Sequence, residues 1–184
     1  MAELIVTTLD DELDAGATIE APGGDGLSLR EAIELAANGD TVVFQDSLSG
    51  TIRISEALGD ITITSDVTIY GDDRITISGD SEGDDTIVNG VTDLAATAAS
   101  ALDDNQRIFS LVSGLSDVVL DGLTITGGRG QSYGGAIDAY RSDLTVQGST
   151  FAGNVVYGGK GGGAIYSYGS LNVSDSTFFG NIAS

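Results

Sequence analysis

Apolar and polar residues alternate along most of the chain, and the alternation recurs in blocks of 26 or 27 residues. The segment GGAIDAYRSDLTVQGSTFAGN at 134–154 returns as GGAIYSYGSLNVSDSTFFGN at 162–181. Further upstream, SDVVLDGLTITGG at 116–128 aligns with SDLTVQGSTFAGN at 142–154. A period of this length is typical of solenoids. The alternation inside each block predicts short strands rather than helices.

Equivalent positions of successive blocks are expected to stack, because a coil of short strands can bury its inner face only against its neighbours. The alignment predicts two apolar ladders, one with Ile137 against Ile165 and one with Phe151 against Phe178. The conserved spacing of Asn154 and Asn181 predicts a ladder of turn asparagines that hydrogen-bond along the stacking axis. The expected fold class is therefore all-β.

The stretch LSLREAIELAANGD departs from the strand pattern. Ser28 and Glu31 have the spacing of a capping box, and Gly39 is a typical helix stop. Ile33 and the neighbouring apolar residues fall on one face, which predicts a short amphipathic helix over residues 29–38. A solenoid leaves the strands at its ends unpaired, so we expect this helix to cover the first coil.

The pattern divides one domain, residues 1–184, into four parts. Residues 1–40 are expected to form an N-terminal strand and the helical cap, and residues 41–79 the first coils. Residues 80–106 break the alternation, include the helix-permissive run LAATAASAL, and are expected to form an insertion loop. Residues 107–184 are expected to form regular coils whose C-terminal end is open.

The motifs LSLREAI, RIFSLV, LDGLTITGG, GGAI and STFFGN together resemble right-handed parallel β-helix proteins of bacterial surfaces, in particular the polymorphic outer-membrane protein repeat. The resemblance covers nearly the whole chain except residues 80–106. It implies a right-handed parallel β-helix with a short N-terminal capping helix, at an extracellular or cell-surface location. It is a poor guide to activity, because this fold carries adhesins and polysaccharide lyases alike.

Composition excludes several functions. The chain has 28 acidic and 7 basic residues and a net charge of -21, which argues against nucleic-acid or anionic-membrane partners. It has no cysteine and no histidine, so disulfides, thiolate metal sites and histidine-based triads are ruled out. No apolar run approaches the roughly 20 residues of a membrane span, and the first residues lack the pattern of a Sec-type signal peptide.

Two acidic stretches are candidate calcium sites, because clustered carboxylates in glycine-rich loops supply the oxygen ligands that calcium prefers. The alternative is that these carboxylates are simply solvated in turns. The candidate ligands are Asp10, Asp11 and Asp14 in the first stretch and Asp80, Asp84 and Asp85 in the second. Calcium is the only cofactor that the sequence suggests.

No set of acids aligns across several coils on one strand, so the sequence predicts no catalytic residue. We expect a non-enzymatic structural or adhesive segment of a bacterial surface or matrix protein. Its C-terminal end could be continued by further chain, meet the same end of another copy, or bind the strand at residues 3–8 of another copy and so propagate head to tail.

The alternative function is a carbohydrate-active β-helix, either a polysaccharide lyase or hydrolase or a sugar-binding module. Tyrosines crowd the last two repeats, and exposed tyrosines can stack on sugar rings, although packing against strands and turns is the simpler explanation. These tyrosines are Tyr133, Tyr140, Tyr157, Tyr166 and Tyr168.

Overall fold

The computed structural model describes residues 1–88, 91–92, 104–158 and 161–184. The described residues contain one helix, α1 (Leu29–Leu35), near the N-terminus; the other regular elements are short strands joined by turns. The strands are β1 (Glu3–Val6), β2 (Asp40–Phe44), β3 (Gly50–Arg53), β4 (Ile61–Ile63), β5 (Val67–Ser78), β6 (Ile87–Val88), β7 (Val91–Thr92), β8 (Phe109–Leu111), β9 (Val118–Thr126), β10 (Arg129–Gly130), β11 (Ile137–Ala139), β12 (Leu144–Gln147), β13 (Thr150–Ala152), β14 (Val155–Val156), β15 (Ile165–Ser167), β16 (Leu171–Ser174), β17 (Thr177–Phe179) and β18 (Ile182–Ala183).

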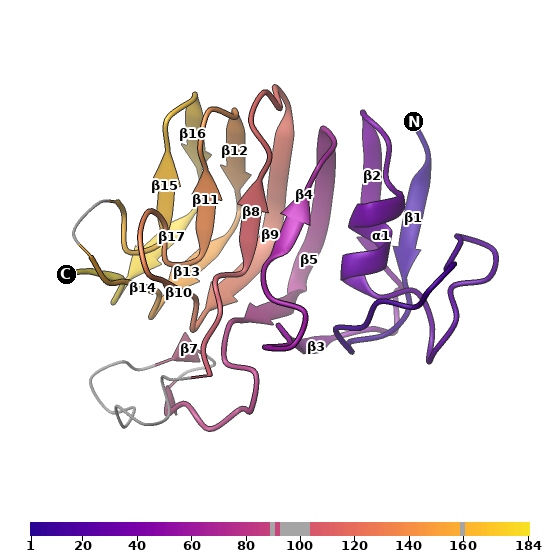
Figure 1. Ribbon diagram of the computed structural model, residues 1–184, viewed down its shortest axis with the longest axis horizontal. Helices are drawn as coiled ribbons and strands as arrows, with labels where there is room; N and C mark the ends of the chain where they lie inside the picture. The colour runs from indigo at the N-terminus through magenta and orange to yellow at the C-terminus, as the bar shows by residue number, and fades with distance from the viewer. Residues whose placement is uncertain (89–90, 93–103, 159–160) are drawn as a thin grey trace.

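The strands form parallel sheets that run along the long axis of the molecule (Figure 1). The largest sheet has the order β1-β2-β5-β9-β12-β16, with β3, β13 and β17 attached to it. A second sheet has the order β4-β8-β11-β15, and a third has the order β10-β14-β18. Within the described residues only the small β6-β7 pair and two isolated bridges are antiparallel. The all-β class predicted from the alternation is confirmed.

Each strand of the last repeats pairs with the strand one repeat away, in the register that the aligned motifs predict. Ile137 of β11 lies opposite Ile165 of β15, and Phe151 of β13 lies opposite Phe178 of β17. The two phenylalanine rings stack with their centroids 4.9 Å apart. Sequence spacing therefore determines three-dimensional neighbours here, because parallel pairing with a fixed register requires blocks of nearly constant length.

Inward-facing residues of the largest sheet form a continuous apolar row. Val42, Ile69, Leu120 and Val146 occupy equivalent positions on successive strands, and each is fully buried. Val173 of β16 is the next member of the row and is 47% exposed. A member of the row is buried where a strand lies on both sides of it, and Val173, which has a neighbouring strand on one side, remains exposed.

The helix α1 begins as predicted and ends three residues earlier than predicted. The Ser28 hydroxyl accepts a hydrogen bond from the Glu31 amide at 3.1 Å, and the Glu31 carboxylate accepts one from the Ser28 amide at 3.0 Å, which completes the capping box. The helix stops at Leu35 because Ala36 adopts an extended conformation. Gly39 does not end the helix; it has a φ of 84° in the turn that leads into β2.

The two ends of the insertion lie together. Asp80 and Asn105 form an isolated antiparallel bridge, so the chain leaves and rejoins the parallel sheets at one place. Strands β6 and β7 pair inside the insertion, to one side of the parallel sheets (Figure 1). The helix-permissive run at 94–102 lies outside the described residues. The pairing of β5 with β9 bridges this interruption, with Thr68 opposite Val119.

The turn asparagines form the expected ladder. The Asn154 amide group donates to the carbonyl oxygen of Ile125 at 3.0 Å and to the Asn181 side-chain oxygen at 2.9 Å, and its own oxygen accepts from the Gly128 amide at 2.9 Å. Asn154 is fully buried. A Cβ atom on Gly128 would lie only 2.8 Å from the Asn154 oxygen, so this close approach requires glycine.

We predict that Asn154→Ala lowers the free energy of unfolding by about 3 kcal/mol, because it leaves a buried amide and a buried carbonyl without partners. Asn181→Ala is the matched control. Asn181 is only partly buried, so water can replace its bonds, and we expect less than half of the loss. Urea unfolding of the two variants measures the difference; equal losses would contradict the ladder as a buried stabilising element.

Candidate functional site

The first acidic stretch is not assembled as a metal site. The Asp11 carboxylate binds the Arg30 guanidinium through two hydrogen bonds of 2.8 and 2.7 Å, and it also accepts from the Ser55 amide at 2.8 Å. The side chains of Arg30 and Asp11 are both almost fully buried. Asp10 and Asp14 lie apart from this pair: Asp10 accepts from Thr8, and the Asp14 amide donates to Glu31. Asp11 thus forms a buried ion pair with Arg30, and Asp10, Asp11 and Asp14 do not form a group of neighbouring ligand oxygens such as the one in the second stretch.

The second acidic stretch does form a cluster, with one change of membership. Ligand oxygens of Asp80, Asp84 and Asp104 all lie within 4.8 Å of one another. Asp85, which the sequence suggested as the third ligand, lies outside this group, and its carboxylate accepts from the Asn105 side-chain amide at 3.0 Å. Asp104 lies at the C-terminal end of the insertion, whereas Asp80 and Asp84 lie at its N-terminal end. It joins the cluster because the two ends of the insertion meet in the fold, which the sequence alone does not indicate.

Two of these carboxylates are removed from solvent. Asp80 is 1% exposed, and its Oδ1 accepts from the Gly83 amide at 2.6 Å. Asp104 is 8% exposed; its Oδ2 accepts from the Glu82 amide at 2.7 Å, while its Oδ1 is buried and has no hydrogen-bond partner. A buried carboxylate oxygen without a partner is costly, and a bound cation is one way to satisfy it.

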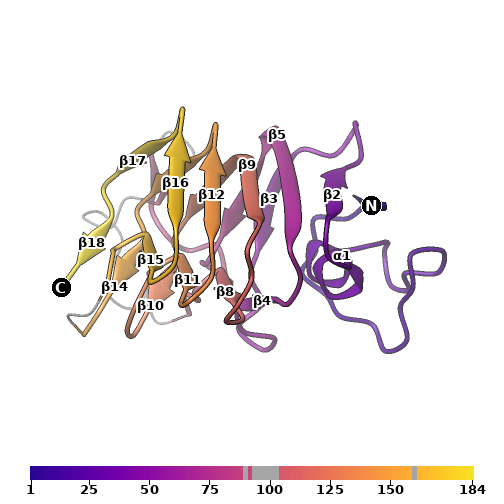
Figure 2. The same ribbon diagram turned by 90° about the horizontal axis from the view of Figure 1, so that it is seen from above.

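The predicted cap residues lie at the N-terminal end of the sheets. Ser28, Glu31 and Ile33 are all buried. The helix α1, which Ser28 caps, contacts β1, β2 and β4. Figure 2 shows it beside β2 at the N-terminal end of the molecule. The apolar face of the helix thus covers the N-terminal end of the apolar rows.

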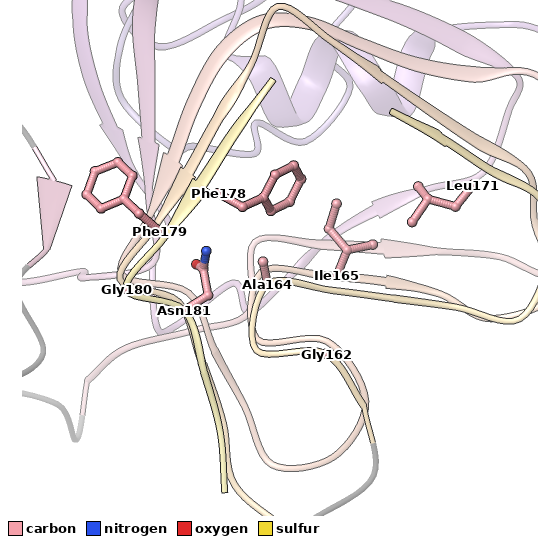
Figure 3. Close-up of a pocket in the computed structure, with 8 residues that line it drawn as sticks. All are labelled: Gly162, Ala164, Ile165, Leu171, Phe178, Phe179, Gly180 and Asn181. Carbon is pink, nitrogen blue, oxygen red and sulfur yellow. The ribbon is translucent and has the colours of Figure 1, made fainter. Parts of the chain in front are cut away.

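The opposite end of the molecule exposes the residues that continue the apolar rows. Figure 3 shows Phe178, Ile165 and Leu171 pointing into one hollow, which has a volume of about 390 Å³. Equivalent residues one repeat earlier, such as Leu144 and Phe151, are buried. The end face consists of residues that are 41–48% exposed: Leu171, Val173, Phe178, Phe179 and Ile182.

A charged cluster that the sequence reading missed lies on the β4-β8-β11-β15 sheet. The Arg107 Nη1 atom is 3.3 Å from an oxygen of Asp60 and 3.9 Å from an oxygen of Asp138. The same guanidinium donates to the carbonyl oxygens of Gly134 and Ser132. Asp60 and Arg107 are 47 residues apart, so no local motif could have paired them. Because the guanidinium of Arg107 binds these protein oxygens, the cluster joins Asp60 to the turn at residues 132–134.

Burial raises the pKa of Asp138, since the protein withdraws the carboxylate from water, and Arg107 and the Tyr140 amide offset only part of this effect. Asp66 behaves in the opposite way. Burial acts to raise its pKa, but the amides of Ser116 and Asp117, at 2.8 and 3.0 Å, outweigh burial and lower the pKa. Ionisation of Asp138 therefore destabilises the folded protein as the pH rises, whereas ionisation of Asp66 stabilises it.

Tyrosines lie side by side next to this cluster. The ring of Tyr133 is 4.8 Å from the ring of Tyr166 and 6.3 Å from that of Tyr140. Tyr140 in turn stacks on Tyr168 at 5.6 Å. Each of these rings lies against another ring, so packing accounts for part of the crowding of tyrosines, while Tyr133, Tyr140 and Tyr168 are still partly exposed to solvent.

The fold and these sites define a mainly parallel all-β protein with one capped end and one apolar end. No protein-family model, no curated protein and no solved structure matches the chain. Among the described residues no helix has both the length and the apolar character needed to span a membrane.

We predict that Asp138→Asn raises the free energy of unfolding at pH 7 and has no effect near pH 3. A folded-state pKa above the unfolded one favours the protonated form, so the wild-type residue costs stability as the pH rises through that pKa. Unfolding curves between pH 3 and pH 7 measure the difference.

Asp66→Asn provides a control of opposite sign. A lowered folded-state pKa stabilises the protein above the unfolded pKa, and this stabilisation disappears as the pH falls. The variant should therefore be less stable than the wild type at pH 7 and equally stable at low pH. A loss of stability in Asp138→Asn at pH 7 would contradict the assigned environment.

Proposed function

We propose that the chain is a right-handed parallel β-helix that serves as a non-enzymatic structural or adhesive segment of a bacterial surface or matrix protein. The observation that carries this proposal is the continuous apolar row, which is covered by α1 at one end and exposed at the other. In-register pairing of strands one repeat apart supports the β-helix. The resemblance to polymorphic outer-membrane protein repeats supports an extracellular or surface location.

The charged groups also favour a structural role over catalysis. The most clustered charges on the β4-β8-β11-β15 sheet, Arg107, Asp60 and Asp138, bind one another and nearby carbonyl groups. A catalytic base or acid must instead reach a substrate. A carbohydrate-active enzyme therefore remains the weaker alternative.

The end face is proposed to bind the N-terminal edge strand of a second copy. Strands β1 and β16 are the two edges of the largest sheet, and every strand between them is parallel. Continuing the observed register places Val173 beside Leu4 of the next copy and Ser174 beside Ile5. The joint would cover apolar residues and satisfy free strand edges, and because it is heterologous it would propagate as a fibre.

We predict that the double variant Ile5→Cys with Ser174→Cys forms disulfide-linked multimers under mild oxidation. The wild-type chain contains no cysteine, so every cross-link involves the introduced cysteines, and the two single variants identify links between identical positions. Non-reducing gels, light scattering and electron microscopy measure the multimers. Ile5→Cys with Gln147→Cys is the matched control, because Gln147 lies one strand inside the edge and β16 covers its outer side.

Three other outcomes would contradict this joint. A monodisperse monomer with no cross-links would exclude self-assembly. Dimers formed by Ser174→Cys alone would indicate that two C-terminal ends meet. Equal cross-linking of the Gln147 control would show that the disulfides form by random collision rather than by strand addition.

We also propose that calcium binds between Asp80, Asp84 and Asp104 and joins the two ends of the insertion. The buried Asp104 Oδ1 without a partner is the observation that favours a cation there. Calcium prefers oxygen ligands, including carboxylates and backbone carbonyl groups. Binding would stabilise the folded chain, since the ligands come together only when both ends of the insertion are in place.

We predict that calcium raises the melting temperature of the wild-type chain, and that Asp104→Asn weakens calcium binding at least tenfold. Calorimetric titration and thermal melts with calcium or with a chelator measure these effects. Asp85→Asn is the matched control and should retain binding within about threefold, because Asp85 lies outside the cluster. Wild-type melting that does not respond to calcium, or an equal loss in Asp85→Asn, would contradict this assignment.

A further inference from the structure

The arginines of this acidic chain fall into two groups. Four of them form ion pairs with aspartates: Arg30, Arg53, Arg74 and Arg107. Among the described residues, Arg129 and Arg141 form no ion pair. Their guanidinium groups instead lie over tyrosine rings, Arg129 at 4.9 Å from the centre of Tyr157 and Arg141 at 5.1 Å from that of Tyr140. In a chain with a net charge of -21, two arginines without a carboxylate partner are unusual.

Arg129 is distinguished from Arg141 by the cavity in front of it. This cavity has a volume of about 760 Å³, within the range of ligand-binding pockets. Its lining brings Arg129 and Tyr157 together with Asn105, Gln106, Gln131 and the ion pair of Asp60 with Arg107. The Asn105 side-chain amide already donates to Asp85 and to the Gly127 carbonyl oxygen, so the two glutamines supply the amide groups for a ligand. The lining therefore offers a cation, an aromatic residue and two glutamines in one place.

We propose that this cavity binds a sugar residue that carries a carboxylate, such as a hexuronate unit of a polysaccharide. Arg129 binds the carboxylate, because a guanidinium matches its two oxygens with parallel hydrogen bonds. Tyr157 packs against the apolar face of the sugar ring, and the glutamine amides bind its hydroxyl groups. This site is independent of the proposed head-to-tail assembly, which uses the end face.

The surroundings limit the ligand to one or a few charged units. Arg107 and Asp60 both line the cavity and form an ion pair with each other, and Asp138 also lies near Arg107, so Arg129 is the cation that remains for a ligand. A densely charged polyanion would be repelled by the acidic chain.

Calorimetric titration with trigalacturonate tests the proposal. The buffer contains a chelator, so that calcium bridging cannot contribute. We expect binding that weakens as salt is added, and a loss of roughly tenfold to a hundredfold in Arg129→Gln, since a hydrogen-bonded charge pair is removed. Arg141→Gln is the matched control, because the same change is made at an unpaired arginine outside the cavity; it should bind within about twofold of the wild type.

The fully methyl-esterified trisaccharide separates the carboxylate from the sugar ring. We expect it to bind at least tenfold more weakly than the acid, and equally to the wild type and Arg129→Gln. No binding of trigalacturonate to the folded wild type would overturn the proposal. Equal binding of the acid and its ester, or equal losses in Arg129→Gln and Arg141→Gln, would also overturn it. Far-ultraviolet circular dichroism of each variant verifies that the fold is intact.

Discussion

The structure depends on parallel pairing between strands that lie one repeat apart. Most strands have only two to five residues, so they gain little stability from local contacts. Each strand receives its backbone hydrogen bonds and covers its apolar side chains only through its neighbours in the stack. Phe151 illustrates the dependence: it pairs with Ile125 on one side and Phe178 on the other, and it is fully buried. Phe178 has a partner on one side and remains exposed.

The acidic side chains are compatible with this stacking because many of them bind the backbone across repeats. The Asp143 carboxylate accepts from the Ser170 amide at 2.7 Å, and Asp66 accepts from the amides of Ser116 and Asp117. Such carboxylates satisfy turn amides that the sheets leave unpaired. The paired arginines act similarly, since Arg30 and Arg107 join segments that are distant in sequence. Among the described residues Arg129 and Arg141 differ from these arginines, because each lies over a tyrosine ring and forms no ion pair.

Contacts between neighbouring strands could be predicted from the sequence where the repeat period is regular. Contacts between residues on the two sides of the insertion at 80–106 could not. The pairings of Ile137 with Ile165 and of Phe151 with Phe178 could be predicted, because a nearly constant block length determines the register. The beginning of α1 could be predicted from its capping box, but its end depends on the turn into β2.

The charged sites could be predicted less well than the ladders. Asp104 joins Asp80 and Asp84 only because the chain returns to its starting point after the insertion. Asp60 and Arg107 meet across the same interruption, and no repeat spacing applies there. Their partners are determined by the path of the insertion, which has no periodic signal.

That interruption also brings the two proposed binding sites together. In residues 104–107, Asp104 belongs to the acidic cluster, Asn105 and Gln106 line the cavity beside Arg129, and Arg107 forms ion pairs with Asp60 and Asp138. A cation bound to Asp104 would reduce the negative potential near the cavity. This effect favours an acidic sugar, and by thermodynamic linkage the sugar would favour the cation to the same degree. Sugar binding in the cavity would then be coupled to calcium binding through four consecutive residues.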